Sequence, residues 1–285
     1  MHANLTKMTK TYLTNGKQLS FEKAQVMAII NITPDSFYDG GKFSSVTDII
    51  KDAEIKIHEG ATIIDIGAAS SRPKAPSVSV KDEIVRLREP LTKLRKEFPK
   101  MLISIDTYLS EVAEFSIDLG ADIINDISGG ELDNKMIDVV AKHQIAYVLM
   151  HMQGTPQNMQ LNPTYENVVK ELSDFYKAKI ADCQSKGFEK LIIDVGFGFG
   201  KTVEHNFELL KHLHDFAEFD FPILAGLSRK SMINKVIHTL PATALNGTTV
   251  LNTIALQNGA NILRVHDVKE AKQAIDLFEF YKGVK

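Results

Sequence analysis

The stretch MLISIDTYLSEVAEFSIDLGADIINDISGG, residues 101–130, carries the pattern that decides the fold. It contains two apolar runs of strand length, Met101–Ile105 and Asp122–Ile124, both rich in β-branched isoleucine. Apolar residues between the runs recur at helical spacing, and Gly120 follows them where a helix is expected to end in a left-handed cap. The stretch therefore predicts one strand-helix-strand unit.

The same alternation continues along the rest of the 285-residue chain. Six further apolar runs have strand length and are separated by segments of helical spacing. They are Val26–Ile30, Thr62–Ile66, Ile145–Met150, Leu191–Asp194, Pro222–Ala225 and Asn261–Val265. Eight units with almost continuously apolar strands favour a closed parallel barrel over an open doubly wound sheet. We therefore predict an α/β fold, a TIM (β/α)8 barrel, in a single domain spanning residues 1–285.

A shorter motif precedes the first unit. Residues Tyr12–Phe21 are extended in character on both sides of Asn15-Gly16, a dipeptide that favours a two-residue hairpin turn. We expect this short N-terminal β-hairpin to cover the N-terminal mouth of the barrel.

Composition limits the classes of partner. The chain is 44% hydrophobic and 24% charged, with a formal net charge of −3, so no global positive field attracts nucleic acid or anionic lipid. Cys183 is the only cysteine, which excludes intramolecular disulfides and thiolate metal clusters and indicates a reducing compartment. Met1–Lys10 has no apolar signal region, and no later run reaches membrane-spanning length. We expect a cytoplasmic protein whose partners are small-molecule substrates, with no nucleic acid and no membrane.

Polar side chains follow nearly every predicted strand. The carboxyl ends of barrel strands meet at one mouth, where enzymes of this architecture place their sites. A single residue of this kind is more simply explained as a turn former, but the full set is not. The set comprises Asn31, Ser71, Arg72, Asp106, Asn125, His151, Asp194, Ser228, Arg229, Lys230, Arg264 and His266.

The acids and the amide in this set suit one kind of ligand. Asp106, Asp194 and Asn125 offer acceptors and donors that match a flat heterocycle with several N–H groups. The alternative for Asp106, which precedes Thr107, is a structural ion pair or a helix N-cap.

The cations suit an anion. Arg264 and His266, with Lys230 as a third candidate, can bind and stabilise negative charge. Arg264 can also lay its guanidinium on a heteroaromatic face. The loop that follows Asn31 is polar and rich in glycine, as expected of a mobile lid. An oxygen ligand at its root suits Mg²⁺, which prefers few protein contacts and substrate phosphates.

Motifs along the chain resemble those of the dihydropteroate synthases, a family of pterin-binding barrel enzymes. Met27–Phe37, with Asp39–Gly41, is similar to the N-terminal signature of that family. Seven further segments follow in the order of the family and extend the likeness over essentially the whole chain. They are Ser70–Pro73, Ile103–Thr107, Ile124–Gly130, Leu149–Pro156, Asp194–Lys201, Gly226–Ser231 and Arg264–Asp267.

The resemblance implies an enzyme that joins a pterin methyl pyrophosphate to p-aminobenzoate and expels pyrophosphate by a dissociative mechanism. It also implies Mg²⁺ as cofactor, with Asn31 as the metal ligand, and a homodimer built from late helices around Thr243–Gln257. Sulfonamides are expected to occupy the p-aminobenzoate pocket.

The resemblance assigns the site residues as follows. The pterin is expected to contact Asp106, Asn125, Met150, Asp194, Phe199, Lys230 and Arg264. The p-aminobenzoate pocket is expected to contain Phe37, Ser71, Arg72, Pro73 and Ser231, with Phe199 beside them. Pyrophosphate is expected at Asn31, Arg264 and His266. The catalytic group is expected to be Asn31, Asp106, Lys230, Arg264 and His266.

The chain departs from the family pattern in two places. The second loop reads Gly-Ala-Ala-Ser-Ser-Arg-Pro-Lys over residues 67–74, where the family usually has Gly-Gly-Glu-Ser-Thr-Arg-Pro-Gly. Ala69 therefore lacks a carboxylate, and Lys74 makes the loop stiffer and more basic. Val195 replaces a proline after the strand that ends in Asp194. Lys201 is predicted to be a solvated surface residue, as are five histidines outside the motifs: His143, His205, His212, His214 and His238.

Three other functions remain open on the residues alone. One is the methyltetrahydrofolate-dependent methyltransferase domain, which shares pterin-binding acids but lacks the combination of Lys230 with Arg264 and His266. A second is a Schiff-base aldolase with Lys230 as nucleophile. A third is a non-enzymatic binding module, which the altered second loop favours and the intact acids and cations disfavour.

Overall fold

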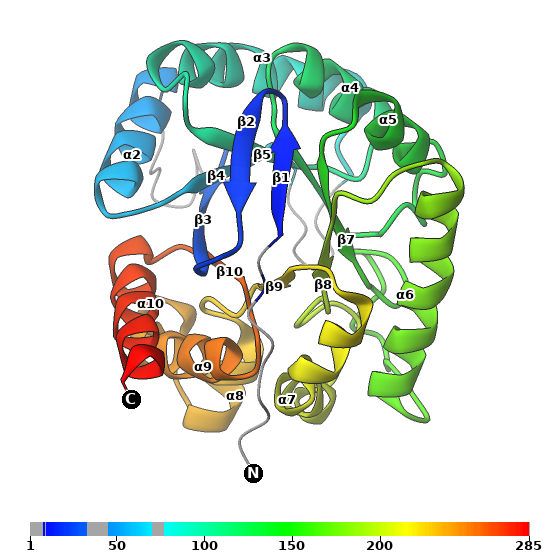
Figure 1. Cartoon of the computed structure of the whole chain (residues 1–285), viewed down its shortest axis with the longest axis vertical. Helices are drawn as coiled ribbons and strands as arrows, with labels where there is room; N and C mark the ends of the chain where they lie inside the picture. Colours follow the sequence, from blue (N-terminus) through cyan, green and yellow to red (C-terminus); the bar gives the residue numbers. More distant parts are fainter. Residues whose placement is uncertain (1–7, 9, 33–44, 70–76, 285) are drawn as a thin grey trace.

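The computed structural model describes residues 8, 10–32, 45–69 and 77–284. Eight parallel strands close into a barrel in the order β10-β3-β4-β5-β6-β7-β8-β9, and helices surround it (Figure 1). The strands are β3 (Gln25–Asn31), β4 (Ile63–Gly67), β5 (Leu102–Asp106), β6 (Ile123–Asp126), β7 (Ala146–Met150), β8 (Leu191–Asp194), β9 (Ile223–Ala225) and β10 (Ile262–Val265). Each predicted apolar run overlaps one of these strands, so the predicted TIM barrel is confirmed.

The helices lie between the strands in chain order and cover the outside of the barrel. They are α2 (Val46–His58), α3 (Val80–Glu97), α4 (Ser110–Asp118), α5 (Met136–His143), α6 (Val168–Ser185), α7 (Val203–Lys211), α8 (Ser231–Ile237), α9 (Leu245–Gln257) and α10 (Val268–Gly283), with the 3-10 helices η1 (Leu213–Phe219) and η2 (Pro241–Thr243). Gly120 has the positive φ that a left-handed helix cap requires. Within the described ranges, no helix is long and apolar enough to span a membrane.

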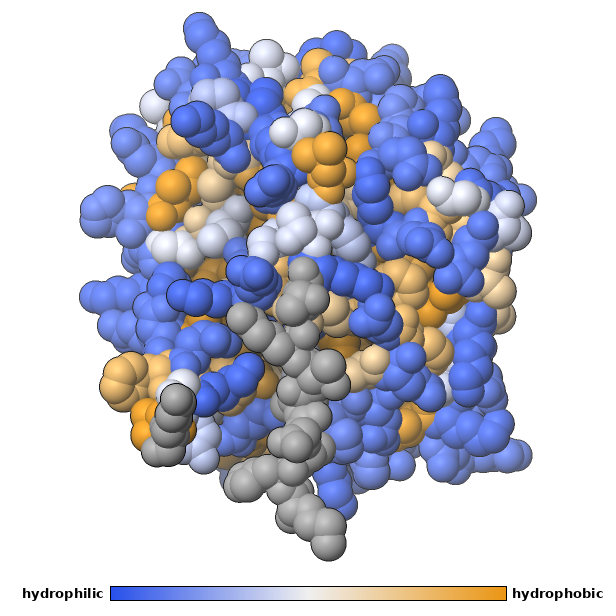
Figure 2. Space-filling view, in the orientation of Figure 1, coloured by the Kyte–Doolittle hydropathy of each residue, from blue (hydrophilic) through white to orange (hydrophobic). Residues whose placement is uncertain are grey.

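The predicted N-terminal hairpin is present and closes one mouth of the barrel. Strands β1 (Thr11–Thr14) and β2 (Lys17–Ser20) pair antiparallel around Asn15, whose φ of 45° and the positive φ of Gly16 fit the predicted turn. In Figure 1 the hairpin lies in front of the barrel, and Figure 2 shows that mainly hydrophilic side chains surround it on this face.

Apolar side chains of the hairpin continue the core inside the barrel. Tyr12, Leu19 and Phe21 pack in one cluster with the first inward-facing residue of the barrel strands, for example Met27 and Ile63. The hairpin therefore completes the lowest layer of the barrel interior, and the polar side chains predicted at the strand ends belong to the opposite mouth.

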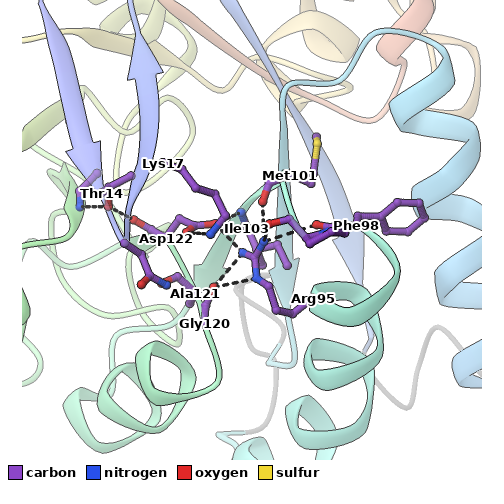
Figure 3. A network of polar contacts seen from close by, with 12 residues as sticks. Thr14, Lys17, Arg95, Phe98, Met101, Ile103, Gly120, Ala121 and Asp122 are labelled. Atoms are coloured by element: carbon purple, nitrogen blue, oxygen red, sulfur yellow. Dashed lines mark hydrogen bonds and ion pairs between the residues drawn. The ribbon is translucent and has the colours of Figure 1, made fainter.

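A polar network fastens the hairpin to the barrel (Figure 3). The fully buried carboxylate of Asp122 accepts from Lys17 Nζ at 2.8 Å and from Arg95 Nη2 at 2.5 Å. It also accepts from the backbone N–H of Ile103 at 2.8 Å, while the Thr14 hydroxyl donates to the Asp122 carbonyl. One acid between β5 and β6 thus holds the hairpin, the end of α3 and a strand together.

Candidate active site

The strand register brings three predicted residues, Asn31, Asp106 and Asn125, into one row with Gly67. Asn31 pairs with Gly67, Gly67 with Asp106, and Asp106 with Asn125, so the carboxyl ends of β3, β4, β5 and β6 lie level. A Cβ on Gly67 would lie 3.4 Å from the Asp106 Cβ and 3.5 Å from Asn31 Oδ1. Glycine at this position therefore leaves the space between Asn31 and Asp106 open.

Arg264 on β10 is shared by two acids at this mouth. Its Nε donates to Asp65 Oδ2 at 2.6 Å, and its Nη2 forms an ion pair with the same oxygen at 2.6 Å and donates to Asp106 Oδ2 at 2.6 Å. The amide of Asn125 donates to the same Asp65 oxygen at 3.2 Å. Burial raises the pKa of Asp106 to about 7, an effect that Arg264 opposes and the neighbouring Asp65 reinforces. Because Asp65 also pairs with Arg264, the Asp106 carboxylate is available to accept hydrogen bonds from a ligand.

A second acid and cation lie across the mouth. Asp194 at the end of β8 accepts from the backbone N–H of Gly196 at 2.8 Å, and burial raises its pKa while Lys230 opposes that shift. The Lys230 ammonium donates to the Phe197 carbonyl and lies 4.8 Å from the centroid of the Phe199 ring. Burial lowers the pKa of Lys230 to about 8, against the attraction of Asp194.

Met150, Ser228 and His266 lie near the strand ends, whereas Ser231 lies at the start of α8. Met150 is 2% exposed and pairs in register with Asp194. The Ser228 hydroxyl lies 3.1 Å from His266 Nδ1 and accepts from the His266 backbone N–H at 3.2 Å. Ser231 is exposed at the first residue of α8.

Arg229 does not join the mouth. It pairs with Asp267 at 2.6 Å and donates to the Pro241 carbonyl at 3.0 Å. The residue is therefore part of the surface scaffold and not of the ring predicted from strand ends.

Several predicted residues lie outside the described residues. These are Phe37, Ser71, Arg72, Pro73 and Lys74, together with most of the expected lid. Ala69, which lacks the family glutamate, is partly buried, and the Arg86 guanidinium donates to the neighbouring Ala68 carbonyl at 2.9 Å. Val195 is fully buried.

The prediction for Lys201 is wrong. Its side chain is 3% exposed, and its ammonium donates to carbonyl oxygens of the β7 and β8 ends instead of reaching solvent. Burial lowers its pKa to about 7, with Asp194 opposing. The five histidines are partly or fully exposed, as predicted, and the described residues contain no group of three or more His, Cys, Asp or Glu that could hold a metal.

Sequence reasoning also missed Asp65. Its carboxylate is fully buried in the middle of an apolar strand and orients Arg264. A charged residue at such a position needs a partner, so its presence in β4 was the available signal.

Glu83 is a buried acid beside the site. It is 1% exposed on α3, the Thr107 hydroxyl hydrogen bonds to it, and its Oε1 has no partner among the described residues. Burial raises its pKa to about 7, and the nearby Asp106 charge adds to this. The folded protein therefore binds a proton on Glu83 at pH values where the unfolded chain has lost it.

This proton predicts the sign of a pH effect. A raised acid pKa adds stability below the unfolded value, and that stability is lost as pH rises towards about 7. Glu83→Gln keeps the side chain neutral, so it should match the wild type near pH 4 and exceed its unfolding free energy by up to about 3 kcal/mol near pH 8. Urea unfolding at both pH values measures this. Glu89→Gln, on an exposed face of α3, is the control, and parallel curves for Glu83→Gln and wild type would contradict the assignment.

Comparison with known proteins agrees with this geometry. Residues 27–266 match the family model described as pterin binding enzyme. The barrel, the acids and cations at its carboxyl mouth and this match define a pterin-binding barrel enzyme.

Individual relatives narrow the class. The dihydropteroate synthase of Escherichia coli K12 is 42% identical over 266 residues, which cover 93% of this chain and 94% of the relative. The structure of Yersinia pestis dihydropteroate synthase with a sulfonamide drug complex has a TM-score of 0.92 at 37% identity, covering 96% of this chain and 100% of that one. The Xanthomonas albilineans dihydropteroate synthase with 4-aminobenzoic acid has a TM-score of 0.90 at 35% identity, covering 97% and 100%. The chain belongs to the dihydropteroate synthase family, whose members are transferases.

Membership of this family confirms the predicted resemblance. It favours the synthase over the methyltransferase, the aldolase and the binding-module alternatives.

Proposed function

We propose that the chain condenses 6-hydroxymethyl-7,8-dihydropterin pyrophosphate with p-aminobenzoate to give 7,8-dihydropteroate and pyrophosphate, a step of folate biosynthesis. The observation that carries the proposal is the shared ion pair of Arg264 with Asp65 and Asp106, level with Asn125 at one mouth of the barrel. An acid-rich wall beside a planar cation suits a flat, donor-rich ring with an anionic substituent.

The pterin ring would lie between the two acid and cation pairs. Asp106 and Asp194 accept from its N–H groups, Asn125 and Lys230 complete the hydrogen bonds, and Met150 with Phe199 pack against it. Asp65 keeps Arg264 oriented, because it holds both Nε and Nη2 when Asp106 turns to the ligand. The Arg264 plane is then available to stack on the ring.

The pyrophosphate would lie at Asn31, Arg264 and His266. Asn31 Oδ1 borders the space beside Gly67, and one amide oxygen of this kind fits Mg²⁺ held mainly by substrate phosphates, with Asn31 as the protein ligand. When bound there, Mg²⁺ neutralises charge on the leaving diphosphate. Arg264 and His266 add hydrogen bonds to the same group.

The reaction would proceed by dissociation. Arylamines are weak nucleophiles, so loss of pyrophosphate first gives a methylene cation stabilised by the pterin. Asp106 and Asp194 place negative charge beside that cation, and exclusion of water protects it until the amine attacks. The amine nitrogen forms the new C–N bond and releases a proton.

The p-aminobenzoate pocket would be formed by Phe37, Ser71, Arg72, Pro73 and Ser231, beside Phe199. Sulfonamides are expected to compete for this pocket because they share the arylamine ring and an anionic group. The absence of a carboxylate at position 69 leaves this pocket less negative than the family pattern.

A pyrophosphate-release assay tests the function. The purified chain is incubated with the pterin pyrophosphate, with and without p-aminobenzoate and Mg²⁺, and both pyrophosphate and dihydropteroate are measured. Stoichiometric product formation that requires p-aminobenzoate supports the proposal. Binding of the pterin without product would instead indicate a binding module.

We also propose a single-domain cytoplasmic homodimer. Apolar side chains on α9 and α10 are exposed, including Val250 at 49%, Leu277 at 72% and Phe280 at 76%. Leu277 and Tyr281 border a hollow of about 370 Å³ between the two helices, and Figure 2 shows hydrophobic residues at the lower left, near the end of α10. A second copy is the expected cover, because α9 contains most of the predicted interface Thr243–Gln257. Analytical ultracentrifugation should give twice the chain mass of 31.7 kDa, and a monomer at micromolar concentration would contradict this.

A further inference from the structure

Lys201 is a buried cation whose bonds all go to one pair of loops. Its ammonium donates to the carbonyls of Phe199 at 2.9 Å, Gly196 at 3.1 Å and His151 at 3.1 Å. His151 Nδ1 lies 3.3 Å from the same nitrogen. Lys201 thus joins the loop after β8 to the residue that follows β7.

The backbone of the loop after β8, residues 196–200, packs directly against the backbone that follows β7. A Cβ on Gly196 would lie 2.1 Å from the His151 carbonyl oxygen, and one on Gly200 would lie 2.5 Å from the Gln153 carbonyl oxygen. Backbone therefore lies directly on backbone. At the first of these contacts the His151 carbonyl, which lies against Gly196, accepts from Lys201, so the ammonium joins the two backbone segments where they touch.

A second side chain holds the same loop from the helix side. Asn206 on α7 is 2% exposed, and its Oδ1 accepts from the Gly198 N–H at 2.6 Å. Its Nδ2 donates to the Lys201 carbonyl at 3.4 Å. Lys201 thus binds the carbonyl groups of the loop, and Asn206 binds one of its amides.

The opposite side of this loop carries contacts of the pterin site. The Gly196 N–H orients the Asp194 carboxylate, the Phe197 carbonyl accepts from Lys230, and the Phe199 ring lies under the Lys230 ammonium. A shift of the loop would therefore move the carbonyl that accepts from Lys230 and the N–H that donates to Asp194.

We propose that Lys201 is a positioning residue of the pterin site: with Asn206 behind it, its ammonium fixes the loop 196–200 and so orients Asp194 and Lys230 toward the pterin. Lys201 does not touch the substrate. The inference rests on the proposed pterin binding, but the order of the loop can be measured without any ligand.

Lys201→Met tests the proposal because it keeps the length of the side chain and removes the donor. Lys190→Met is the matched control: Lys190 also donates to two carbonyls, Leu13 at 2.7 Å and Gln144 at 2.6 Å, but at the hairpin mouth. Binding of the pterin pyrophosphate is measured by calorimetry, and amide hydrogen exchange is followed in peptides covering 195–201 and in peptides of the hairpin.

Lys201→Met is expected to weaken pterin binding at least about tenfold and to speed exchange in 195–201 while exchange in the hairpin stays unchanged. Lys190→Met is expected to show the reverse pattern of exchange and normal affinity. Unchanged affinity of a folded Lys201→Met, or exchange that rises equally everywhere, would overturn the proposal. If Lys201→Met does not fold, Asn206→Ala releases the loop from its other side, and normal pterin affinity with normal loop exchange in that variant would overturn it as well. Failure of the wild type to bind the pterin would contradict the proposed function. The hydrogen-exchange comparison would still show whether Lys201 orders the loop 196–200.

Discussion

Asp106→Ala is expected to abolish measurable pterin binding and with it pyrophosphate release. Hydrogen bonds to a charged group contribute about 1.5–3 kcal/mol each, so a carboxylate that accepts two N–H groups accounts for roughly 100-fold or more in affinity. The variant also leaves Arg264 drawn to Asp65 alone, because the second carboxylate 2.6 Å from its Nη2 is gone. Calorimetry with the pterin pyrophosphate and the release assay measure the two losses.

Two variants separate this effect from a loss of folding. Asp276→Ala removes an exposed carboxylate from the surface pair with Lys272 and should leave binding unchanged. Asp106→Asn keeps the shape and one acceptor, so it should bind the pterin better than Asp106→Ala and worse than the wild type. Near-normal pterin affinity in a folded Asp106→Ala would remove Asp106 from the site and weaken the whole assignment.

The barrel could be predicted because its determinants are local. Apolar runs such as Leu191–Asp194 match the observed strand, and the other runs differ from theirs by one or two residues at an end. The hairpin was equally accessible, since Asn15-Gly16 imposes its turn. Parallel strands in a closed barrel then force the strand-end polar residues to one mouth, which is why Asn31, Asp106 and Asn125 were found together.

The errors arise where a side chain depends on distant partners. Lys201 follows a glycine-rich loop and looks solvated in sequence, but its acceptors come from β7 and β8 ends that only the closed barrel brings together. Arg229 follows a strand like its neighbours, yet its positive φ of 57° accompanies a side chain turned to Asp267. Neither the burial of an ammonium nor the direction of a side chain after a strand is encoded in local spacing.

The largest loss of stability is expected at the opposite mouth, from Asp122→Ala. Asp122 is fully buried, and its truncation leaves Lys17 and Arg95 without their shared anion and the Ile103 N–H without its acceptor (Figure 3). Removing one partner of a buried ion pair costs about 3–5 kcal/mol. The hairpin is also freed on one side, because Lys17 lies on β2. Urea unfolding followed by circular dichroism measures the change.

Pterin binding by the folded variant shows whether this network acts on stability alone or also on the proposed site. The residues of the proposed pterin site lie at the carboxyl ends of the strands, whereas Asp122 precedes β6, so the folded fraction of Asp122→Ala should keep its affinity for the pterin pyrophosphate. Asp118→Ala, an exposed carboxylate at the end of α4, should change neither stability nor activity by a measurable amount. If Asp122→Ala unfolded at the same urea concentration as Asp118→Ala, the polar network would contribute nothing measurable to stability. The hydrophobic contacts of Tyr12, Leu19 and Phe21 alone would then hold the hairpin in the barrel.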